Sequence, residues 1–288
     1  MKTAKHGRFQ AFFAITTATM LAGFSFGQGQ QPAADAAKKA GDASAPGEVI
    51  VLCGGSMRAA MEEIIKQFSL TSKDKVLATY GDSGELCAQI VNAKRADIFM
   101  CHDPFMPWAK EKGAIAEYTA VAYFNPVIVV PKGNPKKITD LEAMSQKGLR
   151  IGFGDMHYST CGEIMKQVMA VRPYGSNLLQ NVVMENKSHA QRCNDVTLGL
   201  LDAAVVWDAV ANLFTNKLDV LPVDLRGVDA ITSATYKKTD VQKTGVTIGL
   251  TKVAENNAAA RRFYEFAKTK GPPIMASKGY SLAPAKNE

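Results

Sequence analysis

Residues 49–57 read Val-Ile-Val-Leu-Cys-Gly-Gly-Ser-Met, an apolar run that stops at two glycines and a serine. Five consecutive apolar side chains without polar alternation are typical of a strand that is buried on both faces, as in a parallel sheet. The next stretch, residues 57–68, carries its apolar side chains at helical spacing. A strand, a glycine turn and a helix in this order predict the first unit of an α/β fold.

The same pattern continues along the chain. Residues 75–79 predict a second strand, which closes at Gly81-Asp82-Ser83-Gly84, and residues 85–92 predict a second helix. Residues 96–101 predict a third strand, followed by another short helix. Strands and helices that alternate with short turns indicate a parallel α/β sheet.

A second α/β set follows an interruption. Residues 120–130 predict one long strand, which prolines and glycine at 131–135 end. The set then consists of expected elements at 149–153 (strand), 161–171 (helix), 182–185 (extended), 194–201 (helix) and 203–207 (strand).

The last part of the chain returns to the first set. Residues 246–250 predict a strand that joins the first sheet, and residues 255–269 predict a final helix. We therefore expect an α/β fold with two lobes and two crossing segments between them. Lobe 1 comprises residues 48–125 and 240–288, and lobe 2 comprises residues 126–239.

The N-terminus has the features of an export signal. Lys2, Lys5 and Arg8 precede a mostly apolar run at 9–26, so residues 1–27 predict a cleaved signal peptide and a periplasmic protein. A membrane anchor is the alternative, but the run is short and threonines interrupt it. Residues 28–47 are rich in Ala, Gln, Gly and Pro, and this composition predicts a flexible linker.

Composition and charge exclude several classes of protein. With 47% apolar and 21% charged residues over 288 positions, the chain can build a sizeable core and is not a disordered chain. The formal net charge of +7 falls to +4 when the three cations of the signal are removed. A surplus this small, without a basic patch that contains aromatic residues, does not predict a nucleic-acid partner.

Two serines occupy equivalent places, each just after a strand and at the start of a helix. Ser56 follows two glycines, and Ser83 precedes another glycine. One such serine alone is commonly only a helix cap. Because ligands of open α/β sheets bind beyond the carboxyl ends of the strands, and helix N-termini favour anions, the two turns together predict an anion site. A matching turn at 152–155, followed by a helix start at 160–162, predicts a third N-terminus facing them.

These turns carry a family resemblance. From Val49 to Leu282 the chain resembles the periplasmic molybdate-binding proteins that feed ABC importers. The matching segments are Val51–Met57, Tyr80–Leu86 with Gln89 and Ile90, Ala96–Phe99, Gly154–Asp155, Asn194–Val196 and Gly271–Tyr280. The resemblance implies a type II two-lobed binding-protein fold, a small tetrahedral oxyanion such as molybdate or tungstate as ligand, and no cofactor. It also implies a monomer that delivers its ligand to an ABC permease in the inner membrane.

The resemblance also implies a set of ligand-binding residues. Ser56 and Ser83 match the two hydroxyl donors, and Cys161 and Val196 match positions that donate a backbone N–H. Trp207 stands where the family has a tyrosine, so its indole N–H would donate from a different place. Such a site contains donors only, and a protonated competitor such as hydrogen phosphate would lack an acceptor.

The departures from the family are cysteines. Cys53, Cys101, Cys161 and Cys193 map to the rim of the expected cleft, and His102 is close to them in sequence. In one interpretation, Cys53 bridges to Cys101 and Cys161 to Cys193, and we favour it because an exported protein meets an oxidising compartment. In the other, thiolates bind Cu(I) or arsenite, and Cys161 at a helix N-terminus should be more acidic than an ordinary thiol and so a better ligand.

We do not expect an enzyme. The four histidines, one of them in the signal, do not assemble with a nucleophile and an acid into a catalytic arrangement, and no metal-binding motif is present.

Overall fold

The structure is a computed structural model, and it describes residues 46–228, 230–232, 238–240 and 243–284. The predicted signal peptide at 1–27 and nearly all of the predicted linker lie outside these residues. Within the described residues, no helix combines the length and the apolar character needed to cross a membrane.

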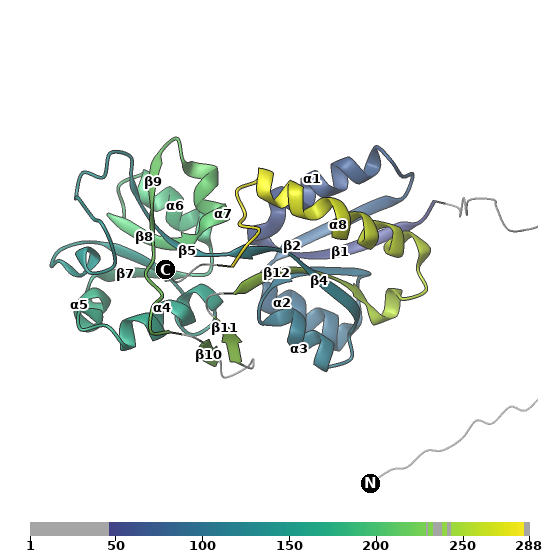
Figure 1. Cartoon of the computed structure of the whole chain (residues 1–288), viewed down its shortest axis with the longest axis horizontal. Helices are drawn as coiled ribbons and strands as arrows, with labels where there is room; N and C mark the ends of the chain where they lie inside the picture. The colour runs from purple at the N-terminus through teal and green to yellow at the C-terminus, as the bar shows by residue number, and fades with distance from the viewer. Residues whose placement is uncertain (1–45, 229, 233–237, 241–242, 285–288) are drawn as a thin grey trace, which may run out of the picture. The chain divides into compact units, whose positions relative to one another are not determined.

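The first lobe is built on a mixed five-stranded sheet (Figure 1). Its strands, in spatial order, are β2 (Lys75–Gly81), β1 (Glu48–Gly54), β3 (Ile98–His102), β12 (Thr244–Thr251) and β4 (Ile115–Phe124). The strands β1, β2 and β3 are parallel, and β12 pairs antiparallel with both β3 and β4. The predicted return of the chain to the first set is therefore confirmed.

Helices cover both faces of this sheet (Figure 1). They are α1 (Arg58–Ser69) and α8 (Ala258–Ser277) on one face, and α2 (Ser83–Ala88) and α3 (Phe105–Glu111) on the other. Short turns of helix are η1 (Gly55–Met57), η2 (Gln89–Ala93) and η5 (Lys252–Ala254). The helix α8 is longer than predicted and continues through Pro272 and Pro273, because Ile274 and Met275 beyond them are buried in the core.

The second lobe has its own five-stranded sheet. Its strands, in spatial order, are β7 (Val182–Asn186), β6 (Ile151–Gly154), β8 (Ala203–Trp207), β5 (Pro126–Pro131) and β9 (Leu218–Pro222). Its helices are α4 (Thr160–Ala170), α5 (Gly175–Gln180), α6 (His189–Thr197) and α7 (Asp208–Ala211), with the short η3 (Ala143–Ser145) and η4 (Asn212–Phe214). A separate two-stranded ribbon joins β10 (Ala230–Thr232) to β11 (Lys238–Asp240). The domain boundaries given above stay predictions.

The long strand predicted at 120–130 is wrong, because the chain changes sheets within it. Strand β4 ends at Phe124, β5 begins at Pro126, and Asn125 lies between them. The backbone N–H and the side-chain amide of Asn125 donate to the carboxylate of Asp208 at 3.2 and 3.0 Å. These contacts fix the crossing at one polar residue inside an otherwise apolar run.

The helix predicted at 194–201 begins five residues earlier. Helix α6 runs from His189 to Thr197, and Ser188 caps it by accepting a hydrogen bond from the N–H of Gln191 at 3.2 Å. The earlier start of α6 means that the first turn of this helix, with its unpaired backbone N–H groups, begins at His189, shortly after β7.

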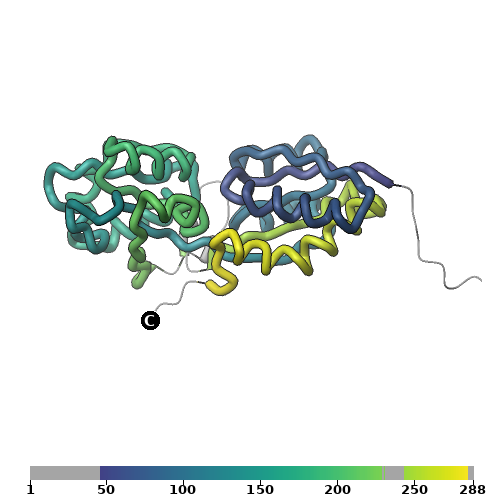
Figure 2. Tube along the Cα trace, turned by 90° about the horizontal axis from the view of Figure 1, so that it is seen from above, coloured from purple at the N-terminus to yellow at the C-terminus, as the bar shows by residue number. Residues whose placement is uncertain are grey.

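A buried carboxylate joins the two ends of the described chain within lobe 1. Figure 2 shows the yellow helix α8 beside the purple N-terminal segment. Asp74, just before β2, accepts two hydrogen bonds from Arg262 of α8, both at 2.7 Å, and one from the N–H of Gly47 at 2.9 Å. The hydrogen bonds from Arg262 hold the pKa of Asp74 well below its usual range, and its side chain is only 2% exposed.

We expect Asp74→Asn to lower the free energy of unfolding by about 1.5–3 kcal/mol at neutral pH, because charge-assisted hydrogen bonds are lost. A depressed pKa stabilises the fold above the unfolded-state value of about 4, so the difference from the wild type narrows as the pH falls below it. Urea unfolding at several pH values measures both effects. Glu48→Gln, which breaks the exposed pair with Lys75, is the control and should change little; an equal loss in both variants would contradict the prediction.

Candidate functional site

A cavity of about 530 Å³ lies at the carboxyl ends of strands from both sheets. Residues that follow β1, β2 and β3 line it from lobe 1, and residues that follow β7 and β8 line it from lobe 2. Its wall includes Ser56, Ser83, His102, Cys161, His189 and Trp207. This is the place where open α/β sheets bind ligands, and four of the five predicted ligand-binding residues lie there.

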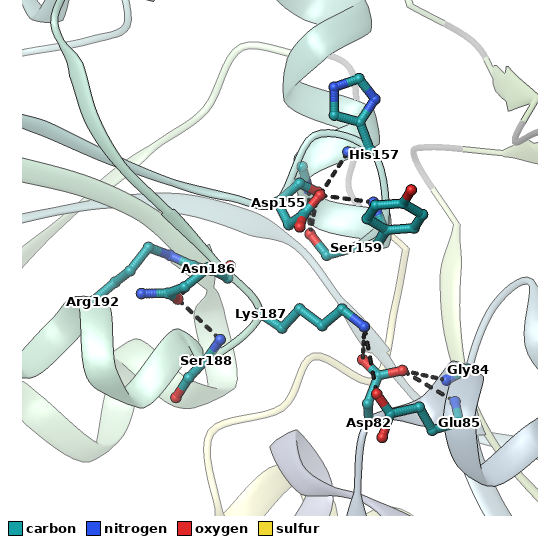
Figure 3. A network of polar contacts seen from close by, with 12 residues as sticks. Asp82, Gly84, Glu85, Asp155, His157, Ser159, Asn186, Lys187, Ser188 and Arg192 are labelled. Atoms are coloured by element: carbon teal, nitrogen blue, oxygen red, sulfur yellow. Dashed lines mark hydrogen bonds and ion pairs between the residues drawn. The ribbon is translucent and has the colours of Figure 1, made fainter.

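Glycine places the hydroxyl of Ser83. Asp82 caps α2 by accepting hydrogen bonds from the N–H groups of Gly84 and Glu85, at 2.9 and 3.1 Å (Figure 3). A Cβ atom added to Gly54 would lie 2.3 Å from Ser83 Oγ, so only glycine at the end of β1 lets this hydroxyl come so close. Ser56 lies in η1, and its carbonyl accepts a hydrogen bond from the Tyr280 hydroxyl at 2.5 Å.

Two helix N-termini form the lobe 2 wall. Ser159 caps α4 and accepts a hydrogen bond from the N–H of Gly162 at 3.1 Å, as Ser188 does for α6. The first turns of these helices line the cavity, α4 with Thr160 and Cys161 and α6 with His189 and Ala190. First-turn N–H groups have no partner within their helix and carry partial positive charge, which favours an anion.

Val196 lies elsewhere. It is fully buried in the last turn of α6 and does not line the cavity, and an N–H at that position bonds within the helix. The role of Val196 was implied by the family resemblance, which matched it to a backbone N–H donor. Because α6 begins at His189, the part of this helix that lines the cavity is its first turn, with His189 and Ala190.

His189 is a cavity residue that sequence reasoning missed. Its Nδ1 accepts a hydrogen bond from the backbone N–H of Trp207 at 3.1 Å and lies 3.0 Å from Nη2 of Arg192. Since both partners are donors, the proton of the neutral ring is assigned to Nε2. Burial and the charge of Arg192 hold the pKa of His189 well below its ordinary value, so the ring is a neutral donor. The signal in the sequence is Ser188, a capping residue just before it.

The other histidine of the cavity wall, His102, carries its proton on the opposite ring nitrogen. Its Nδ1 lies 2.7 Å from the carbonyl oxygen of Asp103, which can only accept, so Nδ1 carries the proton. Burial lowers the pKa of His102, and its Nε2 is then an acceptor. The expectation of a donor-only site is therefore corrected, because His102, which carries an acceptor nitrogen, is among the residues that line the cavity.

Trp207 forms an aromatic part of the cavity wall. Its side chain is only 1% exposed and stacks on Phe124, with ring centroids 5.1 Å apart and planes inclined by 5°. On its other side the ring of His189 stacks at 5.5 Å. The residue implied to replace a tyrosine thus lines the cavity, where it fixes the orientation of His189.

An ion pair crosses the cavity between the lobes. Nζ of Lys187, just after β7, lies 3.9 Å from a carboxylate oxygen of Asp82 and 3.7 Å from one of Glu85 (Figure 3). Asp82 is the cap that positions Ser83, so Lys187 neutralises a carboxylate that would otherwise repel an anion at this place.

All five cysteines are among the described residues, and all are free and buried. The predicted bridge from Cys53 to Cys101 is wrong because of the pleat. Cys53 pairs with Met100 across β1 and β3, so the next residue, Cys101, points to the opposite face of the sheet. The two side chains accordingly belong to different hydrophobic clusters. Cys161 and Cys193 are not bridged either.

The soft-metal site stays a prediction, and the described residues give it no added support. No three His, Cys, Asp or Glu side chains in the described residues are arranged to hold a metal ion. Burial raises the pKa of Cys161 to about 11 and that of Cys193 to about 12, while Arg192 only partly offsets it. The expected acidity of Cys161 is therefore wrong, because desolvation outweighs the helix N-terminus.

Residues 49–281 match the family described as bacterial extracellular solute-binding protein. The chain belongs to this family. Its relatives include the molybdate-binding protein ModA of Escherichia coli strain K12, which is 24% identical over 234 residues, covering 77% of this chain and 84% of that protein. The resemblance inferred from the serine and glycine turns is thus confirmed.

Solved structures of binding proteins share the fold of this solute-binding protein. The substrate-binding domain of a putative molybdenum ABC transporter from Clostridium difficile superposes with a TM-score of 0.62 at 18% identity, covering 82% of this chain and 99% of that one. The sulfate-binding protein SubI from Mycobacterium tuberculosis H37Rv gives 0.63 at 14% identity, covering 81% and 86%. The predicted two-lobed α/β fold is confirmed, and at these identities the similarity concerns the fold alone.

Because the thiols are free and buried, we expect a thiol reagent to react slowly with the native protein and to find five thiols in denaturant without reductant. Titration with a chromogenic disulfide, before and after adding guanidinium, measures both numbers. A fully reduced sample is the control. Three thiols or one in the unreduced, denatured protein would restore the disulfide interpretation.

Proposed function

We propose that this protein captures a tetrahedral oxyanion between its lobes and delivers it to an ABC permease, with molybdate or tungstate as the leading ligands. One observation carries the proposal. The hydroxyl-bearing turns at Ser56 and Ser83 and the first turns of α4 and α6 all line one cavity. Hydroxyls and backbone N–H groups can compensate a buried anion without a free counter-cation beside it.

The charges around the cavity fit an anion. Its two carboxylates are each paired: Asp82 with Lys187, and Glu62 with Arg58 at 2.7 Å. Unpaired negative charge, which would repel an oxyanion, is therefore not presented by these side chains. The family supports a protein that works in the periplasm and binds rather than transforms its ligand, and we propose that it acts as a monomer.

A soft ligand at the cysteines has less support. Thiols bind Cu(I) and arsenite as thiolates, and burial raises the pKa of Cys161, the cysteine that lines the cavity. The other four are buried in the cores beside it.

We expect Ser56→Ala and Ser83→Ala each to weaken molybdate binding about 10- to 100-fold, because each removes a hydrogen bond to a charged ligand. Isothermal titration calorimetry with molybdate and tungstate measures the loss. Ser145→Ala, which removes an exposed hydroxyl bonded to the carbonyl of Glu142, is the matched control. Wild-type affinity in both cavity variants, or binding of Cu(I) and arsenite but no oxyanion, would overturn the proposal.

His102 favours a second candidate, an oxyanion that keeps a proton. An acceptor nitrogen in the wall can receive the O–H of hydrogen phosphate, which donors alone would reject. The two candidates differ at one atom: hydrogen phosphate needs Nε2 of His102 as a hydrogen-bond acceptor, whereas molybdate and tungstate do not.

We expect His102→Phe to separate the two candidates. The variant keeps the ring packing against Phe124 and Trp207 but removes the acceptor, so binding of hydrogen phosphate should fall about tenfold or more while molybdate is nearly unaffected. Calorimetry with both anions gives the comparison. His157→Phe, an exposed ring, is the control. If the wild type does not bind hydrogen phosphate, or if His102→Phe binds it as tightly as the wild type does, the second candidate is wrong.

A further inference from the structure

Arg192 is an arginine with no exposed surface, and it lies directly behind the cavity wall. Its guanidinium donates to the carbonyl of Val205 at 3.1 Å and to the carbonyl and side-chain oxygens of Asn186 at 2.6 and 2.9 Å. Its fourth contact is Nδ1 of His189 at 3.0 Å. Figure 3 shows the side chain beside Asn186 at the end of β7. All four partners are neutral.

No carboxylate in the described residues forms an ion pair with this guanidinium. Asp195, on the same helix, is nearly buried, and its Oδ2 has no hydrogen-bond partner in the described part of the chain. Buried charges in proteins are nearly always paired, because desolvation is costly and hydrogen bonds to neutral groups compensate it only in part. The positive charge of Arg192 therefore has no paired carboxylate among the residues that the structure describes.

His189 contacts Arg192 and also lines the cavity, which Arg192 itself does not line. Arg192 and the N–H of Trp207 both donate to Nδ1, and the ring stacks on the indole, so its rotation is restricted. The remaining nitrogen, Nε2, has no partner within the described residues, and His189 lines the cavity. A guanidinium, an imidazole and the cavity thus follow one another in a row.

We infer that Arg192 is the buried counter-charge for the bound anion and, through His189, the positioning residue that turns an N–H donor toward it. This inference rests on the proposed function. It restricts the ligand to a species with net negative charge and an oxygen acceptor, and it makes the affinity depend on a residue that does not touch the ligand.

A merely structural role is the alternative, in which Arg192 only ties β7, β8 and α6 together. The pH profile separates the two roles. The charged and titratable groups around His189 are Arg192 on its own helix, His102 from β3, Cys161 from α4, Asp208 after β8, and Lys187 with Asp82 at the rim. Of these, Arg192 contributes most to holding His189 neutral after burial itself. Without that charge, the imidazole gains protons more easily as the pH falls.

The experiment compares Arg192→Gln, Arg192→Lys and wild type by calorimetry with molybdate, sulfate and hydrogen phosphate. At about pH 8, Arg192→Gln should weaken binding of whichever anion the wild type binds by about tenfold or more, whereas Arg192→Lys, which keeps the charge but not all of the hydrogen bonds, should lose less. At about pH 5.5, where His189 gains protons more easily without the Arg192 charge, Arg192→Gln should recover part of its affinity for molybdate or sulfate, while the wild type changes little. Arg150→Gln, at the distant pair with Asp202, is the control.

A folded Arg192→Gln protein with wild-type affinity and an unchanged pH profile would overturn the inference while leaving the proposed function intact. A wild type that binds none of the three anions would instead refute the proposed function, and the inference with it. If Arg192→Gln does not fold, ¹⁵N imidazole NMR of the wild type provides the test. His189 should be the Nε2–H tautomer and should not titrate between about pH 5.5 and 8; the other tautomer, or an ordinary titration, would overturn the inference.

Discussion

The lobe 2 wall of the cavity depends on hydrogen-bond satisfaction of one buried guanidinium. Arg192 can be buried only where several carbonyl oxygens converge, and the ends of β7 and β8 provide them. Meeting this requirement holds the first turn of α6 against those strand ends and fixes the ring of His189. On the lobe 1 side, the missing Cβ of Gly54 has the corresponding effect, because it admits the hydroxyl of Ser83. The two walls are thus set by buried contacts just outside the cavity.

Much of this arrangement could be predicted from the sequence. Apolar runs that end in glycine and serine located β1 and β2, and with them the turns at Ser56 and Ser83, because strand burial and backbone turns are local properties. The apolar run of β3 was identifiable in the same way. The strand β12 was also identifiable. It is a short apolar run late in the sequence, and such a run has to pair with strands from an earlier part of the chain. The resemblance placed Cys161 and Trp207 at the cavity, where the structure also has them.

The rest depended on long-range pairing or on single polar residues. Cys53 and Cys101 both end strands, but which face each side chain takes follows from the register of β1 on β3, which no local pattern contains. Asn125 divides one apolar run between two sheets because Asp208, 83 residues away, binds it. Val196 came from matching the chain to a family position, and the structure instead puts the first turn of α6 at the cavity. The polar stretch at the start of α6 hides the helix that Ser188 begins, and this concealed His189.

The five free thiols set an order of events for a chain that is exported. Each is reactive while the chain is unfolded and protected once the core closes over it, and the native state has no bridge that could guide the pairing of cysteines. Any disulfide formed before folding is therefore an error that must be reversed. Folding and thiol oxidation therefore compete as rates. The rate at which both cores close, more than their final stability, determines how much of the newly exported chain reaches the native state.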